Sequence, residues 1–254
     1  LHPCCAPSSN GETIAAQMEK LYSAGHKYKN NGQFVEAREE YSKLMNLAEE
    51  VNDGLNHALA RDFIASTHFN MKDYNKAIEL YKQSEGFYEK EGHESILAST
   101  YAWIELSYSA LKQYQKALEF ALLRVDIVKK LGDKPRLAST YLTVGNNFWY
   151  LGNYDQSIES KKKALAIYEE LGDDSKIAST YKDIGVDLSD INQKQKALHY
   201  LMKALEINRK PGRERELAEI FEWIGIFYRE SNDYDRSITN FEQALRLYEK
   251  FKNK

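Results

Sequence analysis

The feature that most constrains the fold is a repeat with a period of 40 residues. The string Leu-Ala-Ser-Thr-Tyr at 97–101 recurs at 137–141, and near copies occupy 177–181 and 217–221. Continuing the spacing toward the N-terminus gives six units that begin near residues 18, 58, 98, 138, 178 and 218. A period of roughly 20 to 50 residues indicates an array in which each unit buries its apolar face against its neighbours. The array accounts for the chain from about residue 14 to 252.

The first half of each unit has the pattern of an amphipathic helix. Columns 4, 7, 8 and 11 of the unit hold mostly apolar or small residues, as in Tyr141, Val144, Gly145 and Phe148. Spacings of three, one and three residues place these side chains on one stripe of a helix. A small residue at column 8 lets another helix approach closely, which justifies a glycine that costs about 1 kcal/mol of helix propensity.

A second apolar stripe follows in each unit, as in Phe34, Ala37 and Tyr41. Turn residues separate the two stripes, for example at 31–33, and favour two antiparallel helices joined by a short turn. The units themselves are separated by sequences such as 131–135, which combines a C-cap glycine, an N-cap aspartate and a proline. The chain is therefore predicted to be all-α.

The order of the columns resembles the tetratricopeptide repeat family, most clearly over 141–165 and 221–245. The units are 40 residues long, against about 34 in the common form, and resemble the long-unit subgroup of the family. The resemblance implies a right-handed α-solenoid of six tandem helix-turn-helix repeats, with residues 14–254 as a single domain. Three departures, Arg61, Glu105 and Lys161, stand in columns that are otherwise aromatic or small and predict looser packing in their units.

The composition and motifs argue against several functional classes. A formal net charge of −3 disfavours a general nucleic-acid binder, which would carry a basic excess. No glycine-rich phosphate loop, nucleophile elbow or His-x-x-x-His pair occurs, so we predict no enzyme activity, no cofactor and no metal site. The sequence contains no apolar run long enough to insert in a membrane.

The N-terminal residues are predicted to lie outside the array. Residues 1–13 are expected to be a disordered leader or a remnant of processing or expression, because the chain starts at Leu1 and not at Met. The two cysteines, Cys4 and Cys5, are adjacent there and offer no disulfide framework. We expect a cytoplasmic protein, or a periplasmic or secreted one if residues 1–10 are the remnant of a signal peptide.

The resemblance also implies which residues face a concave groove. In the family, the first helix of each unit lines the groove, and its columns 2, 5, 6, 9, 12 and 13 face inward. Carried onto this sequence, the predicted partner-binding residues are Tyr22, His26, Phe63, Phe69, Trp103, Leu106, Asn146, Trp149, Lys182, Trp223 and Arg229. All three tryptophans of the chain fall in this set, and rigid aromatic rings are common anchors of peptide recognition. The alternative is that these rings pack between neighbouring first helices.

Three functional hypotheses follow. The first is a non-enzymatic interaction module, an adaptor that holds a peptide or a partner segment in the groove. The second is a sensor or regulatory domain of a larger signalling protein whose effector lies outside this chain. The third is a self-associating array, in particular a homo-oligomer formed through the C-terminal helix, which carries Phe241, Leu245 and Tyr248.

Overall fold

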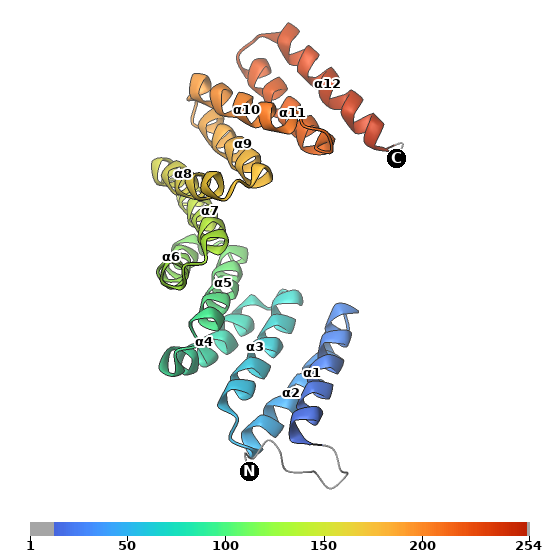
Figure 1. The fold of residues 1–254 in the computed structure, drawn as a ribbon, viewed down its shortest axis with the longest axis vertical. Coiled ribbons are helices and arrows are strands. Elements are labelled where there is room, and N and C mark those ends of the chain that lie inside the picture. The colour runs from blue at the N-terminus through green and yellow to red at the C-terminus, as the bar shows by residue number, and fades with distance from the viewer. Residues whose placement is uncertain (1–12, 253–254) are drawn as a thin grey trace. The chain divides into compact units, whose positions relative to one another are not determined.

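The computed structural model describes residues 13–252 of the 254-residue chain (Figure 1). In this range the first six helices are α1 (Ile14–Asn30), α2 (Phe34–Glu50), α3 (Gly54–Asn70), α4 (Tyr74–Glu91), α5 (Glu94–Ala110) and α6 (Tyr114–Leu131). The next six are α7 (Lys134–Tyr150), α8 (Tyr154–Leu171), α9 (Asp174–Asp190), α10 (Lys194–Asn208), α11 (Glu214–Glu230) and α12 (Tyr234–Lys252). Consecutive helices pair, one pair for each predicted unit, and no strand occurs within residues 14–252. The prediction of an all-α array of helix-turn-helix repeats is confirmed.

A left-handed residue closes the turn inside every helix pair. The residue at column 15 has φ between 58° and 78° in all six units, and it is Gly32, Lys72, Lys112, Gly152, Asn192 or Asn232. Glycine adopts this conformation without a steric penalty, whereas a lysine Cβ is crowded there. The left-handed turn therefore occurs in every repeat, and the steric cost of this conformation depends on the residue at column 15.

The junctions between pairs follow the predicted capping pattern. Gly132 ends α6 in the left-handed conformation, and the Asp133 side chain accepts a hydrogen bond from the Arg136 backbone N–H at the start of α7. Pro135 lies in the first turn of α7, where no helical hydrogen bond needs its missing N–H. The same glycine–aspartate pair recurs at 172–173. The predicted leader lies outside the described residues except for Thr13, whose side chain caps α1.

The small residue at column 8 permits close packing inside a repeat, as predicted. A Cβ on Gly25 would lie 2.4 Å from the ring of Tyr41, so only glycine fits that approach. In the fourth repeat, Lys161 takes the place of the ring, and its Cγ lies 3.0 Å from the position of a Cβ on Gly145. Lys161 is buried, so its aliphatic stem fills the space that an aromatic ring fills elsewhere.

The chain forms two compact units that divide between Gly132 and Asp133. The first unit contains α1–α6, and its main core is built around Tyr81, Tyr101 and Ile104. The second unit contains α7–α12, with cores around Ile184 and Leu201. None of the described helices combines the length and apolar character needed to cross a membrane.

Candidate interaction surfaces

Three predicted binding residues of α1 and α3, Tyr22, His26 and Phe63, form one aromatic cluster on the first unit. The ring centroid of Tyr22 lies 4.1 Å from that of His26 and 5.2 Å from that of Phe63. Tyr41 of α2 is fully buried and packs behind them, with its centroid 5.2 Å from that of Phe63. These separations are typical of favourable aromatic pairs. Tyr22 is 36% exposed, so the cluster reaches solvent.

His26 is held by contacts at one ring nitrogen. Its Nδ1 lies 2.8 Å from the Tyr41 hydroxyl oxygen and 3.2 Å from the backbone carbonyl oxygen of Tyr22. Burial lowers the pKa of His26, which favours the neutral imidazole at neutral pH. His26 therefore adds a neutral, hydrogen-bonding ring to the aromatic cluster and no fixed positive charge.

A pocket of about 280 Å³ lies beside this cluster, between α1 and α3. Its apolar lining includes Met18, Leu44 and Leu59, together with the rings of Tyr22 and Phe63. The carboxylates of Glu19 and Asp53 also line it. The pocket is large enough for one large apolar side chain.

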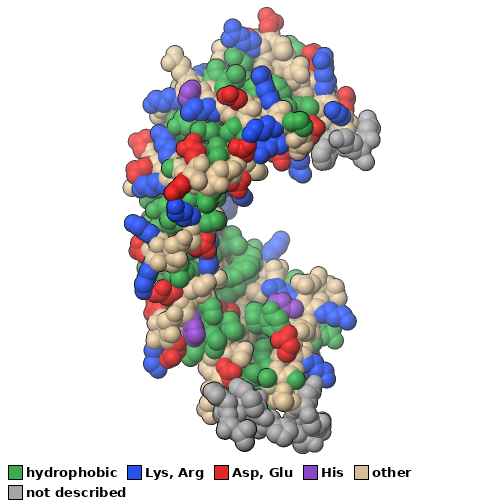
Figure 2. Space-filling view, viewed as in Figure 1, with side chains coloured by type: hydrophobic (Ala, Val, Ile, Leu, Met, Phe, Trp, Pro, Cys, Tyr) green, Lys and Arg blue, Asp and Glu red, His purple; other side chains and the backbone are tan. Residues whose placement is uncertain are grey.

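A second apolar group lies on α3 and α5. The Trp103 ring lies edge-to-face with Phe69, their centroids 5.3 Å apart, and nearly parallel to the buried Tyr81 ring at 6.4 Å. Trp103 is 37% exposed, and Leu106, one turn further along α5, is 44% exposed. Hydrophobic side chains reach the surface of this unit in several places in Figure 2. We call Tyr22, His26, Phe63, Phe69, Trp103 and Leu106 the first-unit surface.

Asp62 stands at column 5 of α3, which faces the groove in the family, but its carboxylate turns into the junction of α3, α4 and α5. Its Oδ2 accepts hydrogen bonds from the Tyr88 hydroxyl at 3.2 Å and the Thr100 hydroxyl at 3.1 Å. Its Oδ1 and the Tyr81 hydroxyl are shielded from solvent, and neither has a hydrogen-bond partner among the described residues. Burial raises the pKa of Asp62 to about 6, although its hydroxyl donors act in the opposite direction.

In the second unit, Trp149 packs against groups of its own unit. Its ring centroid lies 4.5 Å from that of Tyr154 and 5.9 Å from the ammonium of Lys161. That ammonium forms a buried ion pair with Asp187, with Nζ and Oδ2 2.5 Å apart. Burial raises the pKa of Asp187, and the Lys161 charge opposes the rise. Trp149 is half-buried, so much of its surface is already in contact with the unit.

The other predicted residues of the second unit are charged, polar or half-buried. Lys182 of α9 pairs with Glu219 of α11 at 3.0 Å, and both line a polar pocket of about 330 Å³. Trp223 is half-buried against the core cluster around Leu201. Asn146 and Arg229 are exposed. We call Asn146, Trp149, Lys182, Trp223 and Arg229 the second-unit surface.

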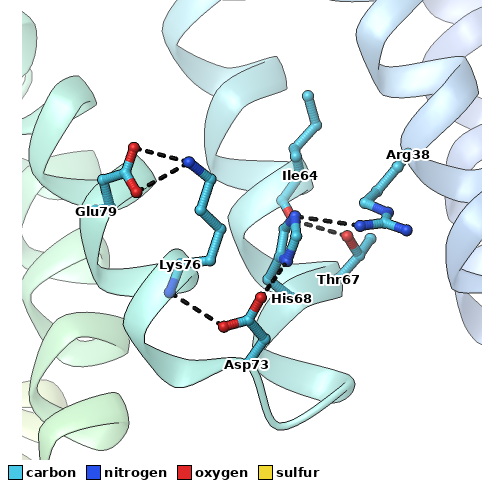
Figure 3. A network of polar contacts seen from close by, with 7 residues as sticks. All are labelled: Arg38, Ile64, Thr67, His68, Asp73, Lys76 and Glu79. Carbon is cyan, nitrogen blue, oxygen red and sulfur yellow. Dashed lines mark hydrogen bonds and ion pairs between the residues drawn. The ribbon is translucent and has the colours of Figure 1, made fainter.

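A polar network on α2, α3 and α4 contains a histidine–aspartate pair (Figure 3). Arg38 Nη1 lies 3.3 Å from Nε2 of His68, and Nδ1 of His68 lies 3.1 Å from Oδ2 of Asp73. A guanidinium can only donate, so Nε2 accepts and Nδ1–H donates to the carboxylate. Asp73 also caps α4 by accepting from the Lys76 backbone N–H. Both ring nitrogens are thus engaged in holding helices together, and neither offers a free lone pair for acid–base chemistry.

Among residues 13–252, no group of three or more His, Cys, Asp and Glu side chains is placed to hold a metal ion.

Sequence comparison identifies the repeat. A profile of the tetratricopeptide repeat matches residues 17–90, 94–170 and 136–210, and a second profile of the same repeat matches 218–251. The chain belongs to the tetratricopeptide repeat family. A search of the curated proteins finds no match to the chain.

Solved structures with tetratricopeptide-like folds superpose on most of the chain. BtubC (BKLC) from P. vanneervenii is 18% identical, covers 96% of this chain and 94% of its own, and gives a TM-score of 0.68. A signal transduction ATPase with a tetratricopeptide repeat sensor, from Pyrococcus horikoshii, is 18% identical with a TM-score of 0.73 over 93% of this chain and 36% of its own. A Rap protein in complex with competence and sporulation factor is 15% identical, with a TM-score of 0.58 over 96% of this chain and 78% of its own. At these identities the likeness concerns the fold.

Several residues at these surfaces could not be assigned from the repeat columns alone. Tyr41 and Tyr81 belong to the core column of the second helices, yet their rings pack directly behind Phe63 and Trp103. The burial of the Asp62 carboxylate depends on hydroxyls from α4 and α5. The sequence gives no signal for this burial, because Thr also fills the third column of the two following units, at Thr140 and Thr180.

Proposed function

We propose that the chain is a non-enzymatic protein-interaction module and that the first-unit surface binds an extended segment of a partner protein. The observation that carries this proposal is the solvent exposure of large apolar side chains at columns the family uses for binding. Tyr22, Trp103 and Leu106 are 36%, 37% and 44% exposed. Membership of the tetratricopeptide repeat family supports a role in protein–protein interaction.

The first-unit surface has the properties of a binding hot spot. Trp103 rests on the rings of Phe69 and Tyr81, and Tyr22 rests on Phe63, so these exposed rings are held in place before any partner arrives. A rigid aromatic ring loses little conformational entropy on binding. The surface is therefore organised in advance for contact.

The pocket beside Tyr22 and Phe63 suggests the chemistry of the partner. Its apolar lining fits a large aliphatic or aromatic side chain, and the carboxylates of Glu19 and Asp53 favour a basic residue next to that anchor. We propose a partner segment with one apolar anchor for this pocket, a second for Trp103 and Leu106, and a neighbouring lysine or arginine.

The test is a selection of random peptides displayed on phage against the full chain, followed by affinity measurements with variants. Leu106 and Leu122 make a matched pair, because both are leucines of the third repeat and both are 44% exposed. Leu106 is in the first-unit surface and Leu122 is on α6. The proposal predicts that Leu106→Ser and Trp103→Ala weaken binding of the selected peptides about tenfold or more, while Leu122→Ser leaves it unchanged.

Two outcomes would contradict the proposal. One is equal loss of affinity for Leu106→Ser and Leu122→Ser. The other is a set of selected peptides whose binding is insensitive to Trp103→Ala but is lost in a Trp223→Ala variant of unchanged helicity, which would move the binding site to the second unit.

A sensor or regulatory role is the second candidate. The likeness of the chain to the tetratricopeptide repeat sensor of a signal transduction ATPase favours it, although this chain covers only 36% of that protein. In this role the first-unit surface receives the signal, and an effector outside this sequence responds. A longer gene product that carries an effector domain would support this candidate, and a gene that encodes the array alone would argue against it.

A further inference from the structure

A tyrosine recurs near the end of the second helix in alternate repeats. Column 31 holds Tyr88, Tyr168 and Tyr248 in the second, fourth and sixth repeats. The Tyr88 and Tyr248 hydroxyls donate hydrogen bonds to the column 5 carboxylates of their own repeats, over 3.2 and 3.1 Å. The Tyr88 ring is fully buried, and Asp62, which accepts its hydrogen bond, also accepts one from Thr100 of α5. In the second repeat this phenol therefore fills the space between the first helices α3 and α5.

The fifth repeat has a shorter residue in this column. Asn208 replaces the tyrosine, and Lys182 replaces the carboxylate at column 5. The polar pocket of about 330 Å³ lies at this place, formed by α9, α11 and the end of α10. Lys182 and Ile220, which line it, stand in the columns that Asp62 and Thr100 occupy in the second repeat. The pocket is therefore the space that a tyrosine ring fills in the second repeat.

Asn208 is buried and has an unused hydrogen-bond acceptor. It is 3% exposed, lines the pocket, and donates from Nδ2 to the backbone carbonyl of Ala204 at 3.0 Å. A carbonyl oxygen can only accept, so the amide nitrogen must face Ala204, and Oδ1 is left for another partner. Within residues 13–252, no side chain or backbone group donates to this Oδ1. Buried amide groups are normally paired, so Oδ1 calls for a donor that a ligand brings into the pocket.

The lining of the pocket carries charges of both signs. Lys182 and Arg215 share the carboxylate of Glu219, at N–O distances of 3.0 and 3.8 Å. Lys176 of α9 and Glu216 of α11 line the pocket and are exposed, and neither forms an ion pair with any residue of the described range 13–252. A simple anion would meet Glu216 and a simple cation would meet Lys176, whereas a zwitterion offers each of them an opposite charge.

We propose that this pocket binds a free α-amino acid with a neutral polar side chain, such as glutamine, asparagine, serine or threonine. The α-carboxylate lies beside Lys176 and the α-ammonium beside Glu216, and the side chain enters the pocket to donate a hydrogen bond to Asn208 Oδ1. An aliphatic side chain of the same size leaves Oδ1 unpaired, which disfavours it. A volume of about 330 Å³ is at the small end of ligand pockets and suits one amino acid. The site belongs to the second unit and does not depend on partner binding by the first-unit surface.

The test is a ligand-detected NMR titration of the full chain with single amino acids. Glutamine, asparagine, serine and threonine are compared with leucine and methionine, which are close to glutamine in size and lack its side-chain donor. At least one of the four polar amino acids should bind with a dissociation constant of about 10⁻⁵ to 10⁻⁴ M, and both apolar ones at least about tenfold more weakly. Acetylation of the α-amine or amidation of the α-carboxylate should each weaken binding about tenfold or more, because each removes one charge.

Variants of the pocket test its origin and its charges. Asn208→Tyr restores the tyrosine of the column and should abolish binding with unchanged helicity, because the fourth repeat buries Tyr168 in this column without a carboxylate at column 5. Lys176 and Lys162 make a matched pair, because both are exposed and neither forms an ion pair within residues 13–252. Lys176→Gln should weaken binding about tenfold, whereas Lys162→Gln, on α8 and outside the pocket, should leave it unchanged.

Several results would overturn the proposal. One is the absence of saturable binding by all four polar amino acids at about 10 mM. Another is binding that survives Asn208→Tyr, or that Lys176→Gln and Lys162→Gln weaken equally. If Asn208→Tyr loses helicity, Lys176→Gln/Glu216→Gln decides, since both side chains are exposed and their exchange leaves the core intact. That double variant should lower the affinity about a hundredfold, and an unchanged affinity would contradict the proposal.

Discussion

The two units are built from the same three-repeat plan, yet their first-helix surfaces differ in chemistry. In the first unit, Trp103 and Leu106 leave much of their apolar surface open to solvent. In the second unit, Lys182 is paired with Glu219, and Trp149 packs against Tyr154 and near Lys161. Trp103 and Leu106 of the first unit thus expose apolar surface, whereas Trp149 and Lys182 of the second unit are engaged by residues of their own unit.

The buried polar groups differ in the same way. Asp62 in the first unit accepts hydrogen bonds from two hydroxyls and forms no ion pair with a residue of the described range 13–252, whereas Asp187 in the second unit has the ammonium of Lys161 at 2.5 Å. The repeat backbone is common to both units. The residues at a few first-helix columns therefore decide whether a repeat exposes apolar side chains or pairs its polar side chains within its own unit.

The largest effect is expected from breaking the ion pair of the second unit. Lys161→Ala leaves the buried Asp187 carboxylate without its partner and should lower the free energy of unfolding by roughly 3 to 5 kcal/mol. The double variant Lys161→Met/Asp187→Asn should recover most of this loss, because it removes both charges and keeps the volume. Urea unfolding followed by tryptophan fluorescence measures both. A single variant as stable as the wild type would mean that the pair does not hold α8 to α9.

In the first unit, removing the charge of Asp62 is expected to raise the free energy of unfolding, and the size of the gain depends on pH. The pKa of Asp62 is about 6 in the folded chain, against an ordinary value of 3.8 in the unfolded chain. The folded state therefore binds the proton more tightly. Its contribution to stability is complete below about pH 3.8 and is lost as the pH rises through 6. Asp62→Asn should therefore gain ~2 to 3 kcal/mol relative to the wild type between pH 4 and pH 7.5.

Urea unfolding of the wild type and Asp62→Asn at the two pH values checks this sign. A stability difference between the two proteins that does not change with pH would show that the Asp62 carboxylate titrates normally. In that case, the hydroxyl environment of Asp62 would not change the stability of the chain through the ionisation of its carboxyl group.

Truncation of two tryptophans compares the units directly. Trp223 is half-buried against the core around Leu201, and Trp103 lies at the surface over Phe69 and Tyr81. Trp223→Ala should cost about 2 kcal/mol of unfolding free energy and Trp103→Ala about 1 kcal/mol. Thermal unfolding measured by circular dichroism gives the order. The reverse order would place Trp103 in the core and remove it from the proposed binding surface.

The smallest effect is expected in the turns within the repeats. Lys112 in the first unit has φ of 58°, whereas Gly152 fills the same column in the second unit. Lys112→Gly should stabilise the chain by about 0.5 to 1 kcal/mol, and Gly152→Ala should destabilise it by a similar amount. Chemical denaturation of both variants tests the pair. Equal and opposite shifts are expected, and destabilisation by Lys112→Gly would indicate that the lysine side chain itself stabilises the turn.

The helices could be predicted from the sequence because the repeat is local and regular. The column spacing places every helix pair, and residues 131–135 predict both the end of α6 and the start of α7. The binding residues were harder to predict, because exposure depends on neighbouring repeats. The column of Lys182 predicts a position in the groove, yet Glu219, 37 residues away, pairs with it. Single columns do not reveal such cross-repeat contacts.

The most direct test of the central claim uses the three tryptophans as reporters. Trp103 lies in the first-unit surface, and Trp149 and Trp223 lie in the second-unit surface. The full chain labelled with 5-fluorotryptophan gives one ¹⁹F resonance for each, assigned by Trp→Phe variants, and a selected peptide is then titrated in. The account predicts that the Trp103 resonance shifts with the binding curve while the other two stay in place. Movement of Trp149 or Trp223 with an unchanged Trp103 resonance would contradict it.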